Sequence, residues 1–166
     1  MRHKYFDIVS GRKQSRVSAE DFRRALRQAG CEPNGPGAFV WNSIGESDKG
    51  SNFNIYLLAF SEPCALFSNT RSLTIKCPNC GTQMTPCEWH GLLNNWRASG
   101  NTGSKVALKC CGVSADIAAL HYDPPVYFTE AAVTLCAPES APAPLDFITR
   151  LQNAVGEPLA CIERIC

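Results

Sequence analysis

The chain has 166 residues, of which 45% are hydrophobic and 19% are charged. This composition excludes a disordered or low-complexity chain and provides enough apolar side chains for one domain with a buried core. Sixteen Lys and Arg residues are nearly balanced by fifteen Asp and Glu residues, and the net charge of +1 excludes a strong overall field toward nucleic acid or an anionic membrane.

The N-terminal residues and the cysteine content both predict a cytoplasmic protein. Asp7 interrupts the first apolar stretch, so we expect no signal peptide. The sequence has no run of about eighteen apolar residues, and we therefore expect no association with a membrane. Ten cysteines exceed ordinary usage, and in a reducing compartment clustered cysteines indicate a metal site more than disulfide bonds.

The first thirty residues predict a strand followed by an amphipathic helix. The pattern over residues 5–9 favours the strand. Ser18 stands where an N-cap is expected, Asp21 follows three residues later as in a capping box, and Gly30 ends the helix. The apolar residues between them recur at helical spacing, so one face of this helix is predicted to be buried and the other to face solvent.

Further segments have the patterns of strands and of a second helix. Residues 38–44 and 53–60 are apolar runs separated by a polar stretch, which predicts a hairpin. Residues 131–136 predict another strand, residues 145–155 a helix, and residues 159–165 a final strand.

These elements predict an α+β fold, in which an antiparallel or mixed sheet has two covering helices on one face. We expect residues 1–166 to form a single domain. Residues 64–122 interrupt the two strand-and-helix parts, and they are predicted to form an inserted subdomain that contains the clustered cysteines.

Two groups of cysteines in this segment are candidates for a metal site. Residues 77–81 read Cys-Pro-Asn-Cys-Gly, which places two thiols in a tight turn where the glycine lets the backbone fold around one ion. Residues 110–112 read Cys-Cys-Gly and follow a second predicted strand at residues 106–109. The strand before the first group is predicted at residues 73–76.

Residues 77–112 resemble a zinc ribbon, in which two such knuckles hold one metal ion. The first knuckle matches the Cys-Pro-x-Cys-Gly pattern of that family at every position. The second knuckle departs from the pattern, because Leu108 stands where the family has its first cysteine. The resemblance implies a structural Zn²⁺ ion, with Cys77 and Cys80 as ligands and Cys110 and Cys111 as further candidates.

The sequence leaves the fourth ligand open. Adjacent cysteines point apart on a strand, so Cys110 and Cys111 share one ion only if the turn is distorted. A helix with a capping box is predicted to begin near residue 86, and it offers Cys87 and His90 on one face as substitutes. Buried thiols without metal, an iron–sulfur cluster and an open catalytic zinc site are the other interpretations.

We expect a protein without catalytic activity, because no catalytic signature is recognised. The sequence contains neither a Gly-x-Ser-x-Gly elbow nor a nucleotide-binding glycine motif, and it has no His-Glu-x-x-His pair for catalytic zinc. A Cys and His dyad stays open, since spatial proximity is not visible in a sequence.

The function expected from these features is that of a protein-binding module of the inhibitor or toxin-immunity type, with a structural zinc insert and a protein partner. The alternative is a nucleic-acid-binding zinc-ribbon protein. The first thirty residues carry eight Lys or Arg against three Asp or Glu. In that alternative, Arg23, Arg24 and Arg27 of the first predicted helix contact phosphates.

Overall fold

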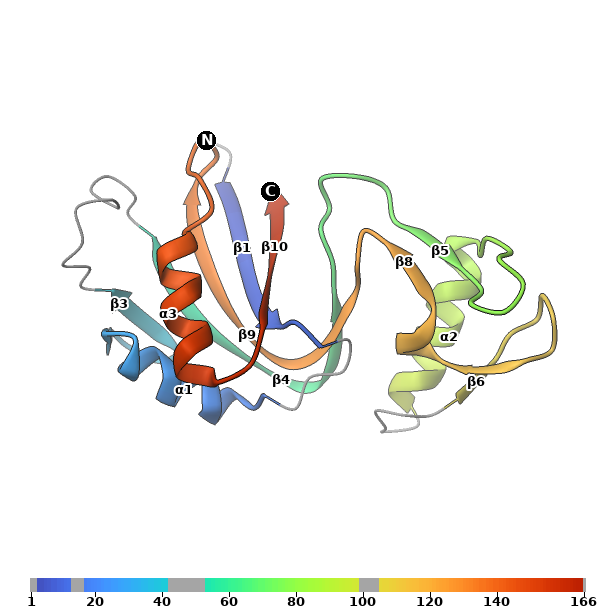
Figure 1. The fold of residues 1–166 in the computed structure, drawn as a ribbon, viewed down its shortest axis with the longest axis horizontal. Coiled ribbons are helices and arrows are strands. Elements are labelled where there is room, and N and C mark those ends of the chain that lie inside the picture. Colours follow the sequence, from blue (N-terminus) through green and yellow to red (C-terminus); the bar gives the residue numbers. More distant parts are fainter. Residues whose placement is uncertain (1–2, 13–16, 42–52, 99–104, 166) are drawn as a thin grey trace.

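The structure is a computed structural model, and it describes residues 3–12, 17–41, 53–98 and 105–165. It has the predicted α+β class (Figure 1). No helix in these ranges is long and apolar enough to cross a membrane. The elements in chain order are β1 (His3–Ser10), α1 (Ala19–Gln28), β2 (Cys31–Pro33), β3 (Ala38–Trp41), β4 (Asn54–Leu66), β5 (Thr74–Lys76), α2 (Pro86–Ala98), β6 (Lys105–Ala107), β7 (Ser114–Asp116), a turn of 3₁₀ helix (Ile117–Ala119), β8 (His121–Asp123), β9 (Tyr127–Pro138), α3 (Leu145–Val155) and β10 (Leu159–Ile165).

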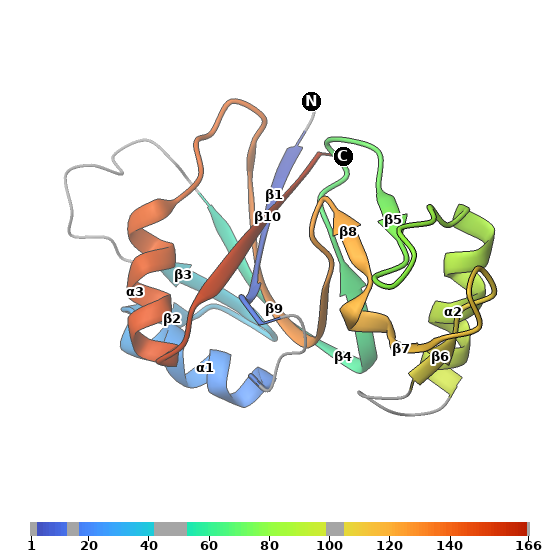
Figure 2. The same cartoon turned by 45° about the vertical axis from the view of Figure 1, so that its right-hand side comes forward.

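Six strands form one sheet in the order β10-β1-β9-β4-β3-β2, and every pair in it is antiparallel. The helices α1 and α3 pack against each other on one face of this sheet (Figure 2), which confirms the two covering helices. The main core lies between these helices and the sheet, and its largest fully buried members are Phe6, Ile8, Phe22, Leu26, Ile55, Leu135, Phe147 and Leu151.

The signals that predicted α1 are present as contacts. The hydroxyl of Ser18 accepts a hydrogen bond from the N–H of Asp21 at 3.1 Å, and the Asp21 carboxylate accepts one from the N–H of Ser18 at 3.0 Å. Both bonds satisfy N–H groups that have no partner inside the helix. The chain leaves α1 through Gly30, whose φ of +90° is costly for other residues.

The two central strands are longer than predicted. The pairing of β4 with β9 continues past residue 60, because an irregularity between Ala59 and Cys64 accommodates extra residues and pairing resumes in a shifted register, with Cys64 opposite Thr129. The polar residues and the proline at 61–63 predict the end of a strand, whereas a bulge absorbs them without ending the pairing. Residues 42–44 of the predicted third strand lie outside the described residues.

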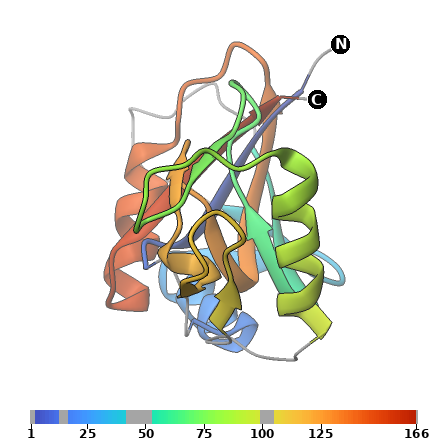
Figure 3. The same cartoon turned by 90° about the vertical axis from the view of Figure 1, so that its right-hand side faces the viewer.

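The segment between β4 and β9 leaves the sheet after Leu66 and returns at Tyr127, and these two residues pair with each other. It contains the two-stranded sheets β5-β8 and β6-β7, together with α2. Figures 1 and 3 show it on the side of the large sheet away from α3. Its buried residues form a second hydrophobic cluster together with Phe128 of β9, and the largest fully buried members are Trp96, Leu108, Ile117 and Leu120.

The start of this segment also contacts the edge strand β10. The side chain of Asn69 donates to the carbonyl of Ile165 and accepts from its N–H, both at 2.9 Å. The Ser68 hydroxyl donates to the carbonyl of Glu163 at 2.8 Å. These bonds cover backbone groups that an edge strand otherwise leaves to solvent or to another chain.

A buried carboxylate lies on the face of the sheet opposite α1 and α3. Asp7 is fully buried, and it accepts a hydrogen bond from the Thr134 hydroxyl at 2.7 Å and pairs with the guanidinium of Arg164. Three adjacent strands supply these groups, so the ion pair links β10 to the centre of the sheet.

We predict that Asp7→Ala lowers the free energy of unfolding by about 3 kcal/mol, because Thr134 and Arg164 then lose their shared acceptor. The expected loss is at the lower end of the range for breaking a buried ion pair. The reason is that the side chain of Arg164 is 32% exposed and regains some hydration in the variant. Urea unfolding measures this loss. Arg23→Ala removes an exposed ion pair with Glu20 and serves as the control, with an expected loss below about 1 kcal/mol. Equal losses in the two variants would contradict this role of Asp7.

Candidate metal centre

The first knuckle is a tight turn closed by backbone hydrogen bonds. The N–H of Cys77 donates to the carbonyl of Thr82 at 2.9 Å, and the N–H of Gly81 donates to the carbonyl of Cys77 at 3.0 Å. Gly81 has a φ of +72°, which explains the glycine at this position. The N–H groups of Asn79 and Cys80 lie 3.4 and 3.5 Å from the sulfur of Cys77, so the turn directs two donors at one sulfur atom.

The second knuckle has the same backbone pattern. The N–H of Leu108 donates to the carbonyl of Val113 at 2.9 Å, and the N–H of Gly112 donates to the carbonyl of Leu108 at 2.8 Å. Gly112 has a φ of +69°. These bonds align the two turns residue by residue, with Leu108 at the position of Cys77 and Cys111 at the position of Cys80. Cys110 therefore occupies the position that Asn79 has in the first knuckle.

Four sulfur atoms come together between these turns. The sulfurs of Cys77, Cys80, Cys110 and Cys111 all lie within 4.8 Å of one another. Three of the distances are 3.7 Å for Cys77 to Cys111, 3.5 Å for Cys80 to Cys110 and 3.9 Å for Cys110 to Cys111. All of these cysteines are free, and the group has the composition and spacing to hold a metal ion.

Cys110 and Cys111 meet the condition under which adjacent cysteines can share one ion, and the backbone gives the reason. Both residues lie in the turn that follows β6 and not on a strand, so the alternation of side chains does not apply to them. The turn brings their sulfurs to the same side. A strict search for two cysteines separated by two residues misses this arrangement, whereas the glycine after Cys111 indicates the turn.

The other candidate ligands lie outside the cluster. His90 is exposed on α2 and its ring packs against that of Trp89, with ring centres 5.3 Å apart. Cys87 is also exposed on α2. The capping box that predicted the start of α2 is present, with Thr85 and Glu88 exchanging hydrogen bonds. The helix therefore forms as predicted, but neither of its two candidate side chains belongs to the group of sulfurs.

The surroundings of Cys80, Cys110 and Cys111 shift their pKa values in different directions. Hydrogen bonds from the hydroxyl and the N–H of Thr82 lower the pKa of Cys80 to about 6. The N–H of Val113 and the amide of Asn79 lower the pKa of Cys111. Loss of hydration among the neighbouring sulfurs raises the pKa of Cys110 to about 12. A cation bound by all four sulfurs would displace the proton of Cys110, which makes its binding sensitive to acid.

The arginines considered for nucleic-acid binding lie on α1, away from the sulfurs. Arg23, Arg24 and Arg27 are all exposed, as the amphipathic pattern predicted. Arg23 forms an ion pair with Glu20, and Arg24 lies 3.4 Å from a carboxylate oxygen of Asp21. Two of the three positive charges are thus partly neutralised by acidic groups of the same helix.

The equivalence of the knuckles predicts a rescue of metal binding. Cys110→Ser removes one sulfur, and Co²⁺ added to this variant should give weaker thiolate absorption bands than in the unchanged protein. Leu108→Cys in the same chain places a thiol at the position equivalent to Cys77, so the double variant should regain the spectrum of four thiolates. Leu108→Ser with Cys110→Ser is the matched control. Equally weak spectra in the two double variants would contradict the alignment.

Comparisons with known proteins found no relative. No protein-family model, no curated protein and no solved structure matches the chain. The two knuckles and the four sulfurs between them are therefore the features from which a function can be inferred.

Proposed function

We propose that the protein is a non-catalytic protein-binding module stabilised by one structural Zn²⁺ ion. Cys77, Cys80, Cys110 and Cys111 are its four ligands. The observation that carries the zinc assignment is the set of distances between the sulfurs. Tetrahedral zinc with bonds of about 2.3 Å requires sulfurs about 3.8 Å apart, and the three distances given above are 3.5, 3.7 and 3.9 Å.

The chemistry of the donors supports the same assignment. Four thiolates form a soft donor set that favours zinc or iron over magnesium or calcium. Sulfurs that lie within 4.8 Å of one another enclose the space of a single ion, which argues against a cluster of several iron atoms. A site with four protein ligands leaves no open position for a substrate, so the ion supports the fold and does not take part in a reaction.

The position of the site explains what the ion would stabilise. The first knuckle follows β5 and the second follows β6, so one ion would join both ends of the stretch that includes α2. Cys77 and Leu108 belong to the hydrophobic cluster of the segment between β4 and β9. A metal-bound core of this kind lets a small, loop-rich inserted subdomain keep one conformation.

The zinc proposal is tested by elemental analysis of the purified, reduced protein. We expect about one zinc per chain, with most of it lost in Cys77→Ser and Cys80→Ser because each removes one of four ligands. Cys87→Ser and Cys161→Ser change exposed cysteines outside the cluster and should keep the full zinc content. Protein without zinc would refute the proposal, and a stoichiometric content of iron would correct the identity of the metal.

The charges on α1 favour a protein partner over nucleic acid. Phosphate binding requires cationic groups that exchange their counterions for phosphates, and the carboxylates of Glu20 and Asp21 already compensate Arg23 and Arg24. An inhibitor or immunity protein instead acts through the shape of its surface. We therefore propose that the partner is a protein and not a nucleic acid.

The class of partner is tested by affinity purification from the cells that make the protein. We expect a protein of defined mass that stays bound in high salt and after nuclease treatment, because apolar contacts resist salt. Replacing Arg23, Arg24 and Arg27 with Ala should leave this partner bound. Recovery of nucleic acid alone, with loss in high salt and in the triple variant, would favour the alternative.

A further inference from the structure

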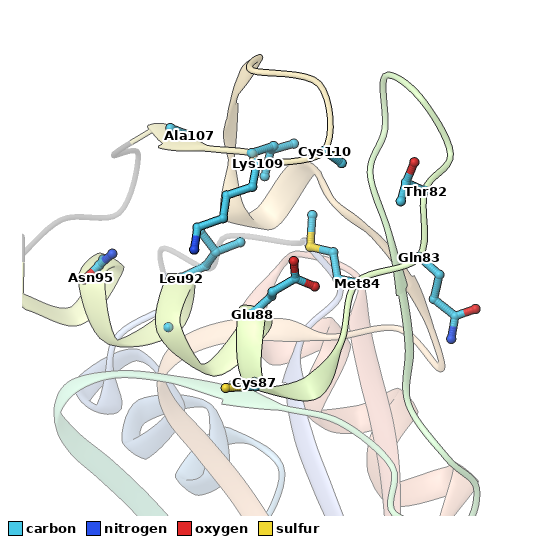
Figure 4. Close-up of a pocket in the computed structure, with 12 residues that line it drawn as sticks. Thr82, Gln83, Met84, Cys87, Glu88, Leu92, Asn95, Ala107, Lys109 and Cys110 are labelled. Atoms are coloured by element: carbon cyan, nitrogen blue, oxygen red, sulfur yellow. The ribbon is translucent and has the colours of Figure 1, made fainter.

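A cavity of about 260 Å³ lies between α2 and the second knuckle, beside the four sulfurs. Gly91 and Leu92 of α2 form one wall, and Ala107 and Lys109 form the opposite wall. Met84 lies between Glu88 and Gln83 (Figure 4). The lining combines apolar groups with a small number of charged groups, which is typical of binding sites.

The strand that borders this cavity, β6, has one edge that no described strand pairs with. β6 pairs only with β7 among the described residues. The N–H of Leu108 donates to Val113, on the side of β7. Because backbone groups alternate along an antiparallel strand, the N–H and carbonyl of Ala107 point away from β7. Ala107 lines the cavity, so these two groups are placed to pair with another extended chain.

Gly91 is a second observation that points to an occupant. Glycine is among the least favourable residues inside a helix, and α2 continues for seven residues beyond this one. A Cβ atom at Gly91 would meet no protein atom within 4 Å, so packing inside the chain does not require the glycine. The space over Gly91 belongs to the cavity and stays open to a bound group.

Lys109 is the cationic residue of the lining, and it is the group that an acidic side chain of the occupant would contact. Lys109 forms no ion pair with a described carboxylate, and Figure 4 shows its side chain reaching from the knuckle toward α2. Hydrogen bonds from Thr85 and, less strongly, the charge of Lys109 lower the pKa of the Glu88 carboxyl. Glu88 is the acidic residue of the lining, but one of its oxygens accepts hydrogen bonds from Thr85 at the start of α2. Lys105, on the same strand as Ala107, is exposed and adds positive charge.

We propose that the groove between α2 and β6 binds an extended segment of a partner protein, with an apolar side chain over Gly91 and an acidic side chain near Lys109. The segment pairs with the backbone of Ala107 and so adds a strand to β6. This inference rests on the proposed protein-binding function and gives it a surface. In this arrangement, the zinc ion fixes the second knuckle, which forms one wall of the groove.

The test uses a displayed library of random peptides, selected on the zinc-loaded full chain. We expect the selected peptides to share an apolar residue next to an acidic one. In calorimetry, Gly91→Leu should weaken their binding by about tenfold or more, because the new side chain fills the cavity. Lys109→Ala should weaken it by about two- to fivefold through the lost charge. Asn94→Leu places the same side chain on α2 outside the cavity and should leave the affinity unchanged.

Zinc content and circular dichroism of each variant show whether it has folded. Peptides that bind Gly91→Leu as tightly as the unchanged protein would overturn the proposal, as would a library that yields no binder. If Gly91→Leu still binds a natural partner, the proposal that the groove binds it is overturned. The proposal of a zinc-stabilised protein-binding module is not affected by that result. Loss of that partner in Gly91→Leu, but not in Asn94→Leu, would assign the groove to it.

Discussion

The pairing of β4 with β9 is the constraint on which the rest of the structure depends. These strands are neighbours at the centre of the sheet, although a long segment separates them in sequence. The entropy cost of closing a loop grows slowly with its length, so the sheet tolerates this segment. The main core lies between the sheet and the helices α1 and α3, and the segment has a hydrophobic cluster of its own. The four sulfurs lie between the two knuckles of this segment, so a metal ion bound there would cross-link it.

Features set by short stretches of chain could be predicted from the sequence. The capping box of α1 depends on residues three apart, and both of its hydrogen bonds are present. The helix over residues 145–155 and the strand over residues 159–165 have the predicted bounds, because Gly156 separates two clear periodicities. The first knuckle is of the same kind, since one turn contains both of its cysteines. In each case local geometry alone selects the structure.

Features that depend on contacts between distant residues could not be predicted in the same way. The second knuckle keeps its turn through backbone bonds and Gly112, while one of its ligands stands at another position of that turn. A search by cysteine spacing alone therefore misplaces Cys110, and the helical spacing of Cys87 and His90 admits His90, which lies outside the group of sulfurs. The continuation of β4 past its bulge was missed for a related reason. Its partner β9 pairs again with residues 64–66, beyond the residues whose composition predicts a loop.

The cover that Asn69 provides for β10 has a consequence for self-association. β10 is an edge strand, and an uncovered edge is a template to which a second copy of the same chain can add. The amide of Asn69 supplies at Ile165 the donor and the acceptor that such a copy would supply. Asn69 belongs to the segment between β4 and β9, which the four free cysteines would cross-link through the proposed metal ion. Disorder of that segment would therefore expose the edge of an otherwise folded sheet, and aggregation would begin from a nearly native molecule.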